Sequence, residues 1–432
     1  MKKLVFHHDL RKLPHQTNDL LPVLLYGISK HVSYIGNTLL KTLEQKGSRI
    51  PEQAMDFLSI AMAVTAADTF ILRNDSEDGW HREINVELPL CKPEQWESVK
   101  NKLEKTLYFL SGDTWSFKFV GGGIKPPKLS DYHIREKCKI LKPLNCVSLF
   151  SGGLDSAIGA IDLINEGYKP LLVSHSYRGD KSYQDKIRES LSGQNWHYQF
   201  NADPHLVGAD ITDVSMRTRS FNFIAFGIIS ACILESVTNK NIIELIIPEN
   251  GFISINAPLT QRRIGSLSTR TTHPYFINAM IDILKTVGLP HLVRNPYQFT
   301  TKGEMVVNCK DKKMLAKIVD SSVSCSHWHR ANKQCGICVP CIIRRSALFA
   351  GNISEYRNYC IDNISSILGN PEKSDDIQSL MLAIEKLKTK NVISWILNNA
   401  PLTYNNISEY EKVFRNGLLE VKNYLNNNGI VF

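Results

Sequence analysis

The sequence lacks a long uninterrupted apolar run and an export signal. None of its apolar segments approaches the length needed to cross a bilayer, and the first residues, MKKLVFHHDLRKLPHQ, hold too short an apolar stretch for a secretory signal. The apolar segment 220–237 is interrupted, and we expect it to be a helix packed on a sheet. We therefore expect a cytoplasmic protein without a membrane partner.

The composition also lacks a strong bias. Hydrophobic residues make up 43% of the 432 residues, which is normal for a globular protein of two or three domains. The formal net charge of +9 is a modest excess that favours anionic ligands or partners. Nucleic-acid binding stays open on this charge, but nothing else in the sequence indicates it.

The ten cysteines lack the context of a disulfide framework, because the chain is long and carries no export signal. Four of them follow the spacing C-x9-C-x2-C-x2-C, namely Cys325, Cys335, Cys338 and Cys341. Two-residue gaps let successive thiolates turn back onto one ion, and four sulfurs complete the tetrahedron that zinc prefers. This closed shell predicts a structural zinc site. The alternatives are free buried cysteines, an iron–sulfur cluster, or replacement of one thiolate by His327 or His329.

The stretch VSLFSGGLDS has the pattern of a strand, a tight turn and a helix. Its β-favouring residues 147–150 stop at Ser151-Gly152-Gly153, and residues 157–166 are amphipathic. Adjacent glycines let backbone amides approach an anion, and the helix directs its positive end at the same spot. The turn lacks the lysine of a Walker A loop, so nucleotide chemistry other than phosphoryl transfer is favoured. The alternative is an ordinary Gly-Gly turn in any strand–helix unit.

The chain divides into three parts by pattern. Residues 1–140 predict an α+β accessory or partner domain, in which the sequence shows no catalytic constellation. Residues 141–350, which include the cysteine segment 325–341, alternate strands and helices and predict an α/β fold with a parallel sheet. Residues 351–432 predict a helical region.

Ligands in such sheets bind at the carboxyl ends of the strands, where SGGLDS lies. Arg217 or Arg219 precedes the long apolar helix, where a cation could reach phosphate oxygens, although a surface arginine pair is an equal alternative. Glu249, Asn250 and Gly251 directly follow the fourth expected strand, 241–248. These residues are therefore expected near the phosphate loop.

A polar segment without clear periodicity, NAPLTQRRIGSLSTRTTHPYF, comes next. Its expected place beside the phosphate loop predicts contact with substrate or pyrophosphate. The candidate residues in it are Arg262, Arg263, Arg270 and His273. Further along, Lys302 could face phosphate, but Thr301 and Glu304 have the spacing of a capping box, which explains a helix start there on structural grounds alone.

Together, SGGLDS and CGICVPCIIRR resemble the 7-cyano-7-deazaguanine synthase family, over roughly residues 145–348. The resemblance implies the adenine nucleotide alpha hydrolase-like fold of N-type ATP pyrophosphatases. In that family ATP adenylates the carboxylate of 7-carboxy-7-deazaguanine, ammonia displaces AMP to give an amide, and a second ATP drives dehydration to the nitrile. The resemblance therefore implies an AMP-forming carbon–nitrogen ligase that uses ATP, magnesium and zinc.

The resemblance also implies roles for particular residues. Asp155 would hold magnesium or orient the loop, and the four cysteines would bind zinc. The residues expected to contact the nucleotide are Ser151, Gly152, Gly153, Leu154, Asp155, Ser156, Glu249, Asn250 and Gly251. The residues expected to act in catalysis are Asp155, Ser156, Arg219 and Arg270.

The chain departs from the housekeeping synthases in its length, its N-terminal part, and the segments IPENGFISINAP and STRTTHPYF. These departures are similar to the longer synthase-like proteins of bacterial anti-phage systems such as the Qat system, which are thought to couple a deazaguanine to a partner protein. We therefore expect an acyl adenylate that is transferred to an amine on a partner of a defence operon. The alternatives are a housekeeping synthase, a tRNA-modifying pyrophosphatase, and a non-catalytic nucleotide-binding scaffold.

Overall fold

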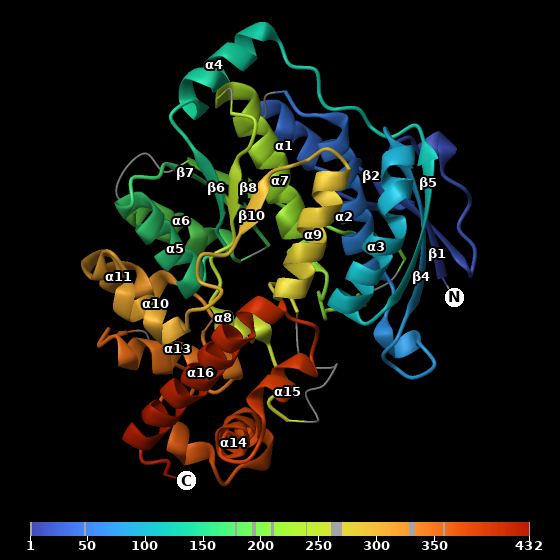
Figure 1. Cartoon of the computed structure of the whole chain (residues 1–432). Helices are drawn as coiled ribbons and strands as arrows, with labels where there is room; N and C mark the ends of the chain where they lie inside the picture. The colour runs from blue at the N-terminus through green and yellow to red at the C-terminus, as the bar shows by residue number, and fades with distance from the viewer. Residues whose placement is uncertain are drawn as a thin grey trace.

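The computed structural model describes residues 2–46, 49–177, 179–191, 196–208, 211–238, 240–260, 270–327, 333–356 and 359–431. These residues form two five-stranded sheets and a helical C-terminal part (Figure 1). All strand pairings in both sheets are parallel. The protein is thus an α/β protein, as the pattern of residues 141–350 predicted.

The sheet in the middle of the chain has the order β10-β9-β6-β7-β8. Its strands are β6 (Cys146–Leu149), β7 (Pro170–His175), β8 (Trp196–Phe200), β9 (Glu244–Ile246) and β10 (Leu292–Arg294). The earliest of them, β6, is central and pairs with β7 on one side and β9 on the other. The strand order reverses at β6, and ligands of open parallel sheets bind at the carboxyl edge at such a point.

The predicted elements of this sheet are largely confirmed. The helices that follow its first three strands are α5 (Leu154–Asn165), α6 (Lys181–Ser190) and α7 (Arg219–Thr238). The fourth strand is shorter than predicted, and β10 was not predicted because only three residues of it pair. The predicted parallel sheet is therefore confirmed, with one extra edge strand.

The helix α7 is apolar nearly all round because other elements cover it. By length and composition it could cross a membrane, contrary to our expectation from the sequence, but 78% of its most apolar window is buried inside the protein. Its Phe221 packs edge-on against Phe57 of α2 (Glu52–Phe70), with ring centroids 5.4 Å apart. The burial is that of a core helix.

The N-terminal sheet has the order β3-β2-β1-β4-β5 and is also entirely parallel. Its strands are β1 (Lys2–His7), β2 (Leu20–Leu25), β3 (Ser33–Ile35), β4 (Glu83–Leu90) and β5 (Thr114–Gly121). The helices α2 and α3 (Pro93–Ser111) cross over between the last three strands. The predicted α+β class is therefore wrong for this part.

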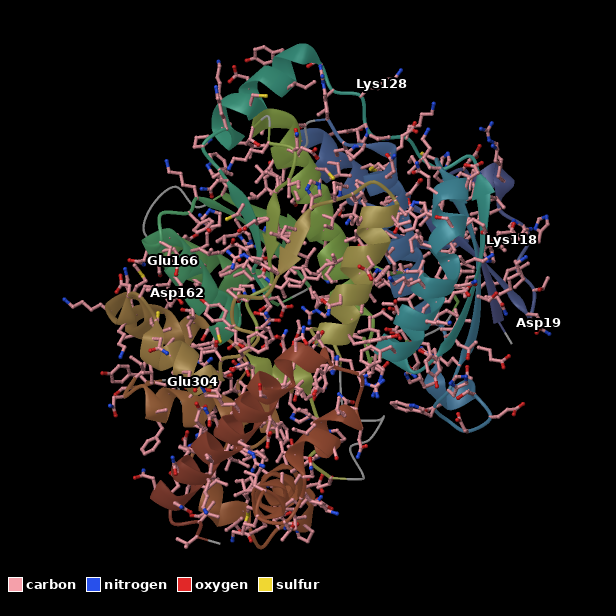
Figure 2. All side chains as sticks on the ribbon, viewed as in Figure 1. Asp19, Lys118, Lys128, Asp162, Glu166 and Glu304 are labelled. Carbon is pink, nitrogen blue, oxygen red and sulfur yellow. The ribbon has the colours of Figure 1, made fainter. Side chains whose placement is uncertain are left out.

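One face of the N-terminal sheet is polar. Lys3 on β1 and Lys118 on β5 flank Glu87 on β4, and their Nζ atoms lie 2.8 and 3.2 Å from Glu87 Oε2. Figure 2 shows Lys118 on this outer side of the sheet. Parallel sheets are usually covered on both faces. Alternation along the strands, with Leu4 and Phe6 inward, lets this sheet keep one face in solvent.

The other face of the N-terminal sheet carries α2 and α3, which also pack against α7 and α9 (Pro274–Thr286). As a result, one continuous apolar core includes Leu4 of the first sheet, Phe57 of α2 and Val147 of the second sheet. The helices lie between the two sheets (Figure 1). Residues 1–140 and 141–350 thus share a core.

The C-terminal part is helical, as predicted. A second apolar core joins its Leu380 and Phe414 to Ile255 and Ile343 of the preceding part. The remaining helices are α1 (Leu39–Lys46), α4 (Asp131–Leu141), α8 (Gly251–Ile255), α10 (Lys302–Asn308), α11 (Lys312–Ile318), α13 (Val339–Ala350), α14 (Pro371–Lys386), α15 (Val392–Leu397) and α16 (Ile407–Asn427). Short 3-10 turns lie at Leu10–Lys12, Arg73–Asp75, Val319–Ser321, Ile364–Ile367 and Tyr404–Asn406.

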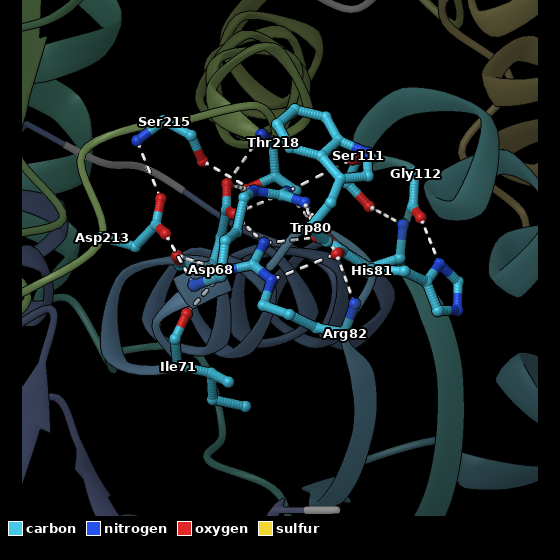
Figure 3. A network of polar contacts seen from close by, with 12 residues as sticks. Asp68, Ile71, Trp80, His81, Arg82, Ser111, Gly112, Asp213, Ser215 and Thr218 are labelled. Atoms are coloured by element: carbon cyan, nitrogen blue, oxygen red, sulfur yellow. Dashed lines mark hydrogen bonds and ion pairs between the residues drawn. The ribbon is translucent and has the colours of Figure 1, made fainter. Parts of the chain in front are cut away.

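A buried network of charges joins the N-terminal sheet to the start of α7 (Figure 3). The Asp113 carboxylate accepts hydrogen bonds from Arg73 Nη2 at 2.8 Å and from Arg82 Nη2 at 2.7 Å. Asp68 pairs with Arg82 and accepts from both the backbone N–H and the hydroxyl of Thr218, each at 2.9 Å. Thr218 directly precedes α7, so a carboxylate of α2 fixes the N-terminus of that helix.

We expect the substitution Asp113→Asn to lower the free energy of unfolding by about 3–5 kcal/mol, because it leaves two buried guanidinium groups with one carboxylate fewer. Chemical denaturation followed by circular dichroism measures the change. The matched control is Glu385→Gln, which breaks an exposed ion pair with Lys388 and should cost less than about 1 kcal/mol. Equal effects of the two substitutions would contradict the role given to the buried network.

Candidate functional site

The SGGLDS loop lies at the carboxyl end of the central strand β6. Gly152 has a φ of +82°, which a side chain would disfavour, and Gly153 precedes α5 without a side-chain cap. Ser151 Oγ accepts a hydrogen bond from the Gly153 N–H at 3.2 Å, and the Ser156 hydroxyl donates to the Gly153 carbonyl at 3.0 Å. The loop therefore has the strand–turn–helix geometry that the sequence predicted. Such a turn presents backbone N–H groups to an anion.

The loop opens onto a cavity of about 310 Å³. The cavity brings together residues from six separate segments of the chain, among them Ser151, Ser156, His175, Arg219, Glu249 and Cys325. Phe223, Ile224 and Ile247 supply apolar walls. A cavity lined by both apolar side chains and several polar groups is typical of a small-molecule site.

Asp155 is buried beneath the loop and holds three segments together. Its Oδ2 accepts hydrogen bonds from the backbone N–H and the side-chain amide of Asn250 at 3.1 and 2.6 Å. Its Oδ1 lies 2.9 Å from the Lys302 ammonium. Burial is the largest effect and opposes ionisation, but the Lys302 charge and the hydrogen bonds from Glu249, Asn250 and Lys302 together outweigh it and lower the pKa of Asp155 to about 2. Both oxygens of Asp155 are thus engaged within the protein, an arrangement that suits orientation of the loop.

Glu249 lies in the cavity wall next to Asp155. Burial, followed by the neighbouring Asp155 charge, raises the pKa of Glu249 well above its usual range. Its Oε1 accepts from the Asn250 amide at 3.1 Å. The two adjacent carboxyl groups are therefore shifted in opposite directions, with the pKa of Asp155 lowered and the pKa of Glu249 raised.

Of the three candidate arginines that the structure describes, Arg217, Arg219 and Arg270, Arg219 is the one that lines the cavity. It begins α7, donates to Asp180 Oδ2 at 2.9 Å, and lies over the Tyr177 ring, 4.9 Å from the centroid. His175, at the end of β7, lines the same wall, and burial keeps the pKa of His175 well below its usual range. The sequence predicted the strand ending there but gave no reason to single out its last residue.

Two other sequence candidates lie against the N-terminal part. Arg270 donates to the Phe109 carbonyl at 3.0 Å and lies over the Phe109 ring at 4.6 Å, so it does not line the cavity. Arg217 lies over the Trp80 ring at 4.3 Å. His273 caps α9 by accepting from the Tyr275 N–H at 3.1 Å. Arg262, Arg263 and His329 lie outside the described residues.

The polar segment nevertheless reaches the cavity through two residues that were not singled out from the sequence. Thr271 and Thr272, the two residues that precede His273, line the cavity wall. They directly follow Arg270. The segment therefore lies beside the cavity, as the sequence predicted, but the residues that line the cavity are the two after the predicted arginine. Hydroxyl groups here face the same space as Glu249.

The four predicted cysteines converge. All four Sγ atoms lie within 4.8 Å of one another, with 3.8 Å between Cys335 and Cys341 and 4.0 Å between Cys325 and Cys338. Tetrahedral zinc with bonds of about 2.3 Å requires sulfur separations of about 3.8 Å. Gly336, with a φ of +86°, makes the turn between ligands. The cluster therefore fits a metal held by four thiolates, which leaves no open position for a reacting group.

This cluster adjoins the cavity. Cys325 lies in the cavity wall, and the N–H of Val323, two residues earlier, donates to the Gly152 carbonyl at 3.0 Å. The buried Arg344, in the segment that follows the last cysteine, donates to the Ser322 hydroxyl and the Val319 carbonyl, both at 2.8 Å. The knuckle and its arginine thus fix the segment that supports the SGGLDS loop.

Another group of possible ligands, Cys232, Glu235 and His291, was not predicted. His291 Nε2 lies 3.3 Å from Cys232 Sγ and 3.6 Å from Glu235 Oε2. However, His291 Nδ1 accepts the Ile243 N–H at 3.4 Å, which places the proton of the neutral ring on Nε2. That nitrogen then has no lone pair for a metal, and the group is best described as a hydrogen-bonded cluster.

No family model matches this sequence, and no curated protein matches it either. The fold and the geometry of the site therefore carry the functional argument.

We expect Cys338→Ser to release the metal of the four-cysteine cluster. Elemental analysis of the purified chain should show about one zinc per chain in the natural protein and a loss of most of it in the variant, because three thiolates no longer close the tetrahedron. Cys360→Ser is the matched control, since Cys360 is exposed and lies outside the cluster. Equal zinc content in both variants would rule out this metal centre.

We expect the free energy of unfolding of Glu249→Gln to increase, relative to that of the natural protein, as the pH rises. The folded-state pKa of Glu249 is raised above its usual value of 4.5, so the folded chain binds more protons than the unfolded chain and the stability falls as pH rises above that value. The amide removes this effect. The stability gap between the variant and the natural protein should therefore grow from pH 5.5 to pH 8, by at most about 1.4 kcal/mol per pH unit.

Denaturant titrations at the two pH values measure this gap. Glu166→Gln is the control, because Glu166 is exposed after the end of α5 (Figure 2) and should leave the gap unchanged. A pH-independent gap for Glu249→Gln would show that Glu249 is ionised in the folded protein.

Proposed function

We propose that this chain is an AMP-forming ligase that adenylates the carboxylate of 7-carboxy-7-deazaguanine, or of a similar deazapurine, and transfers the acyl group to an amine. The acceptor is an amine on a partner protein of a bacterial anti-phage system. The observation that carries the proposal is the SGGLDS loop at the carboxyl end of the central strand, open to the cavity beside it. Its resemblance to the pyrophosphate loop of the synthase family supplies the reaction.

The contacts of the loop suit binding of pyrophosphate. Its backbone N–H groups and the N-terminus of α5 attract the phosphate oxygens, and Arg219 supplies a cation at the same wall. Asp155 fixes the loop from below through Asn250 and Lys302. These groups stabilise the negative charge that develops on the leaving pyrophosphate.

The proposed reaction has two steps. A carboxylate oxygen attacks the α-phosphorus of ATP, the bond to the bridging oxygen breaks, and pyrophosphate leaves. The amine then forms a bond to the acyl carbon, the bond to the AMP oxygen breaks, and a proton is released. Magnesium, when bound with ATP, would supply positive charge against the phosphate oxygens.

The rival reading as a sulfur-transferring tRNA enzyme has little support. Such an enzyme needs a reactive cysteine near the loop. Cys146 and Cys232 are both fully buried, and burial raises the pKa of the Cys146 thiol to about 12. Among the described residues, the cysteine that lines the cavity is Cys325, which belongs to the metal cluster.

The proposal is tested by incubating the protein with ATP, magnesium and 7-carboxy-7-deazaguanine and measuring pyrophosphate and AMP. We expect both products in equal amounts, and at least about a tenfold loss in Ser156→Ala, whose missing hydroxyl removes one contact in the loop. A mass measurement of co-expressed partner proteins then identifies the acceptor.

Glu166→Gln serves as the control, because Glu166 lies just after the end of α5, at the opposite end of that helix from the loop. Pyrophosphate release that is the same without the deazaguanine would point to simple ATP hydrolysis. No release above that of the Ser156→Ala protein would refute the proposed ligase.

A further inference from the structure

The C-terminal helix α16 contacts the first turn of α10, next to the phosphate loop. The Glu420 carboxylate accepts hydrogen bonds from the Thr301 hydroxyl and from the Gly303 N–H, the latter at 3.1 Å. Between these two residues lies Lys302, whose ammonium pairs with Asp155 at 2.9 Å. Residues more than a hundred positions apart thus form a chain of contacts from α16 to SGGLDS.

The contact requires a glycine at position 303. A Cβ atom there would lie 2.5 Å from the carboxyl carbon of Glu420, closer than side chains approach one another. The Glu420 carboxylate can therefore approach the backbone this closely because residue 303 is a glycine. A helix that merely packed on its neighbour would not need it.

The start of α10 does not need Glu420 as its cap. Thr301 and Glu304 already form a capping box, in which Thr301 Oγ accepts the Glu304 N–H at 3.0 Å and Glu304 Oε2 accepts the Thr301 N–H at 2.8 Å. Glu420 adds an acceptor for the Gly303 N–H, which the box leaves free. Burial raises the pKa of Glu420 to about 7 despite these donors, so placing a carboxylate here is costly.

We propose that Glu420 is a positioning residue that fixes the first turn of α10 and so holds Lys302 against Asp155. The C-terminal region then helps to position the residues that support the phosphate loop. A lysine side chain has several rotatable bonds, and a fixed backbone on either side limits where its ammonium can lie. The inference rests on the proposed function for the ligand of the loop, but the contact chain itself is independent of any ligand.

The first test uses hydrogen exchange of the ligand-free protein. We expect Glu420→Gln to increase amide exchange about tenfold both in residues 301–308 and in residues 151–157, because one acceptor and the negative charge are lost. The matched control, Glu411→Gln, removes another acidic residue of α16, which pairs with Arg415 on the surface, and should change neither segment. Faster exchange in residues 301–308 alone would reduce Glu420 to a local cap and overturn the proposal.

The second test asks whether Glu420 acts through Lys302. Binding of a fluorescent ATP analogue is compared in Glu420→Gln, Lys302→Met and the double variant. We expect about a tenfold weaker affinity in Glu420→Gln and no further loss in the double variant relative to Lys302→Met. Additive losses would show that Glu420 acts independently of Lys302 and would overturn the proposal.

The two tests separate the proposals. If the natural protein binds no nucleotide, the proposed function fails, while the exchange measurement still decides the role of Glu420. If Glu420→Gln does not fold, Gly303→Ala replaces it, because the added methyl group displaces the carboxylate from the same turn.

Discussion

The ion pair between Asp155 and Lys302 is the constraint on which the candidate site depends. A buried carboxylate is tolerated only when it is paired and hydrogen-bonded. Asp155 therefore has to draw Asn250 and Lys302 to the carboxyl edge of β6, and each of them brings a different part of the chain. The loop, the segment after β9 and the start of α10 are thus fixed by one buried group. The loop and the segment after β9 both line the cavity.

The shared core has a similar consequence for the N-terminal part. Because α2 lies between its own sheet and α7, residues 1–140 cannot move freely relative to the second sheet. Asp68 of α2 fixes Thr218, and the next residue, Arg219, lines the cavity. The N-terminal part therefore acts on the site through the backbone of α7, whether or not it also presents an acceptor.

Local spacing explains what the sequence could predict. The SGGLDS turn, the cysteine knuckle and the helix α7 depend on neighbours within a few residues, and the structure shows all three. The parallel N-terminal sheet could not be predicted, because β1 to β3 are joined without α-helices and β1 pairs with β4, a distant segment of the chain. Arg270 shows the same limit: its sequence surroundings are polar, but the aromatic partner that binds it, Phe109, belongs to α3.

The cysteine cluster illustrates how a closed metal shell could still shape the candidate site beside it. Four thiolates would leave the ion no open position for a substrate. The ion would therefore contribute to the site only by holding the neighbouring chain in place. The segment between Val319 and Cys325 is held at one end by the cluster and along its length by Arg344. Because Val323 in that segment binds the Gly152 carbonyl, loss of the metal would reach the phosphate loop through a single backbone hydrogen bond. The two motifs that stand far apart in the sequence are therefore one structural unit.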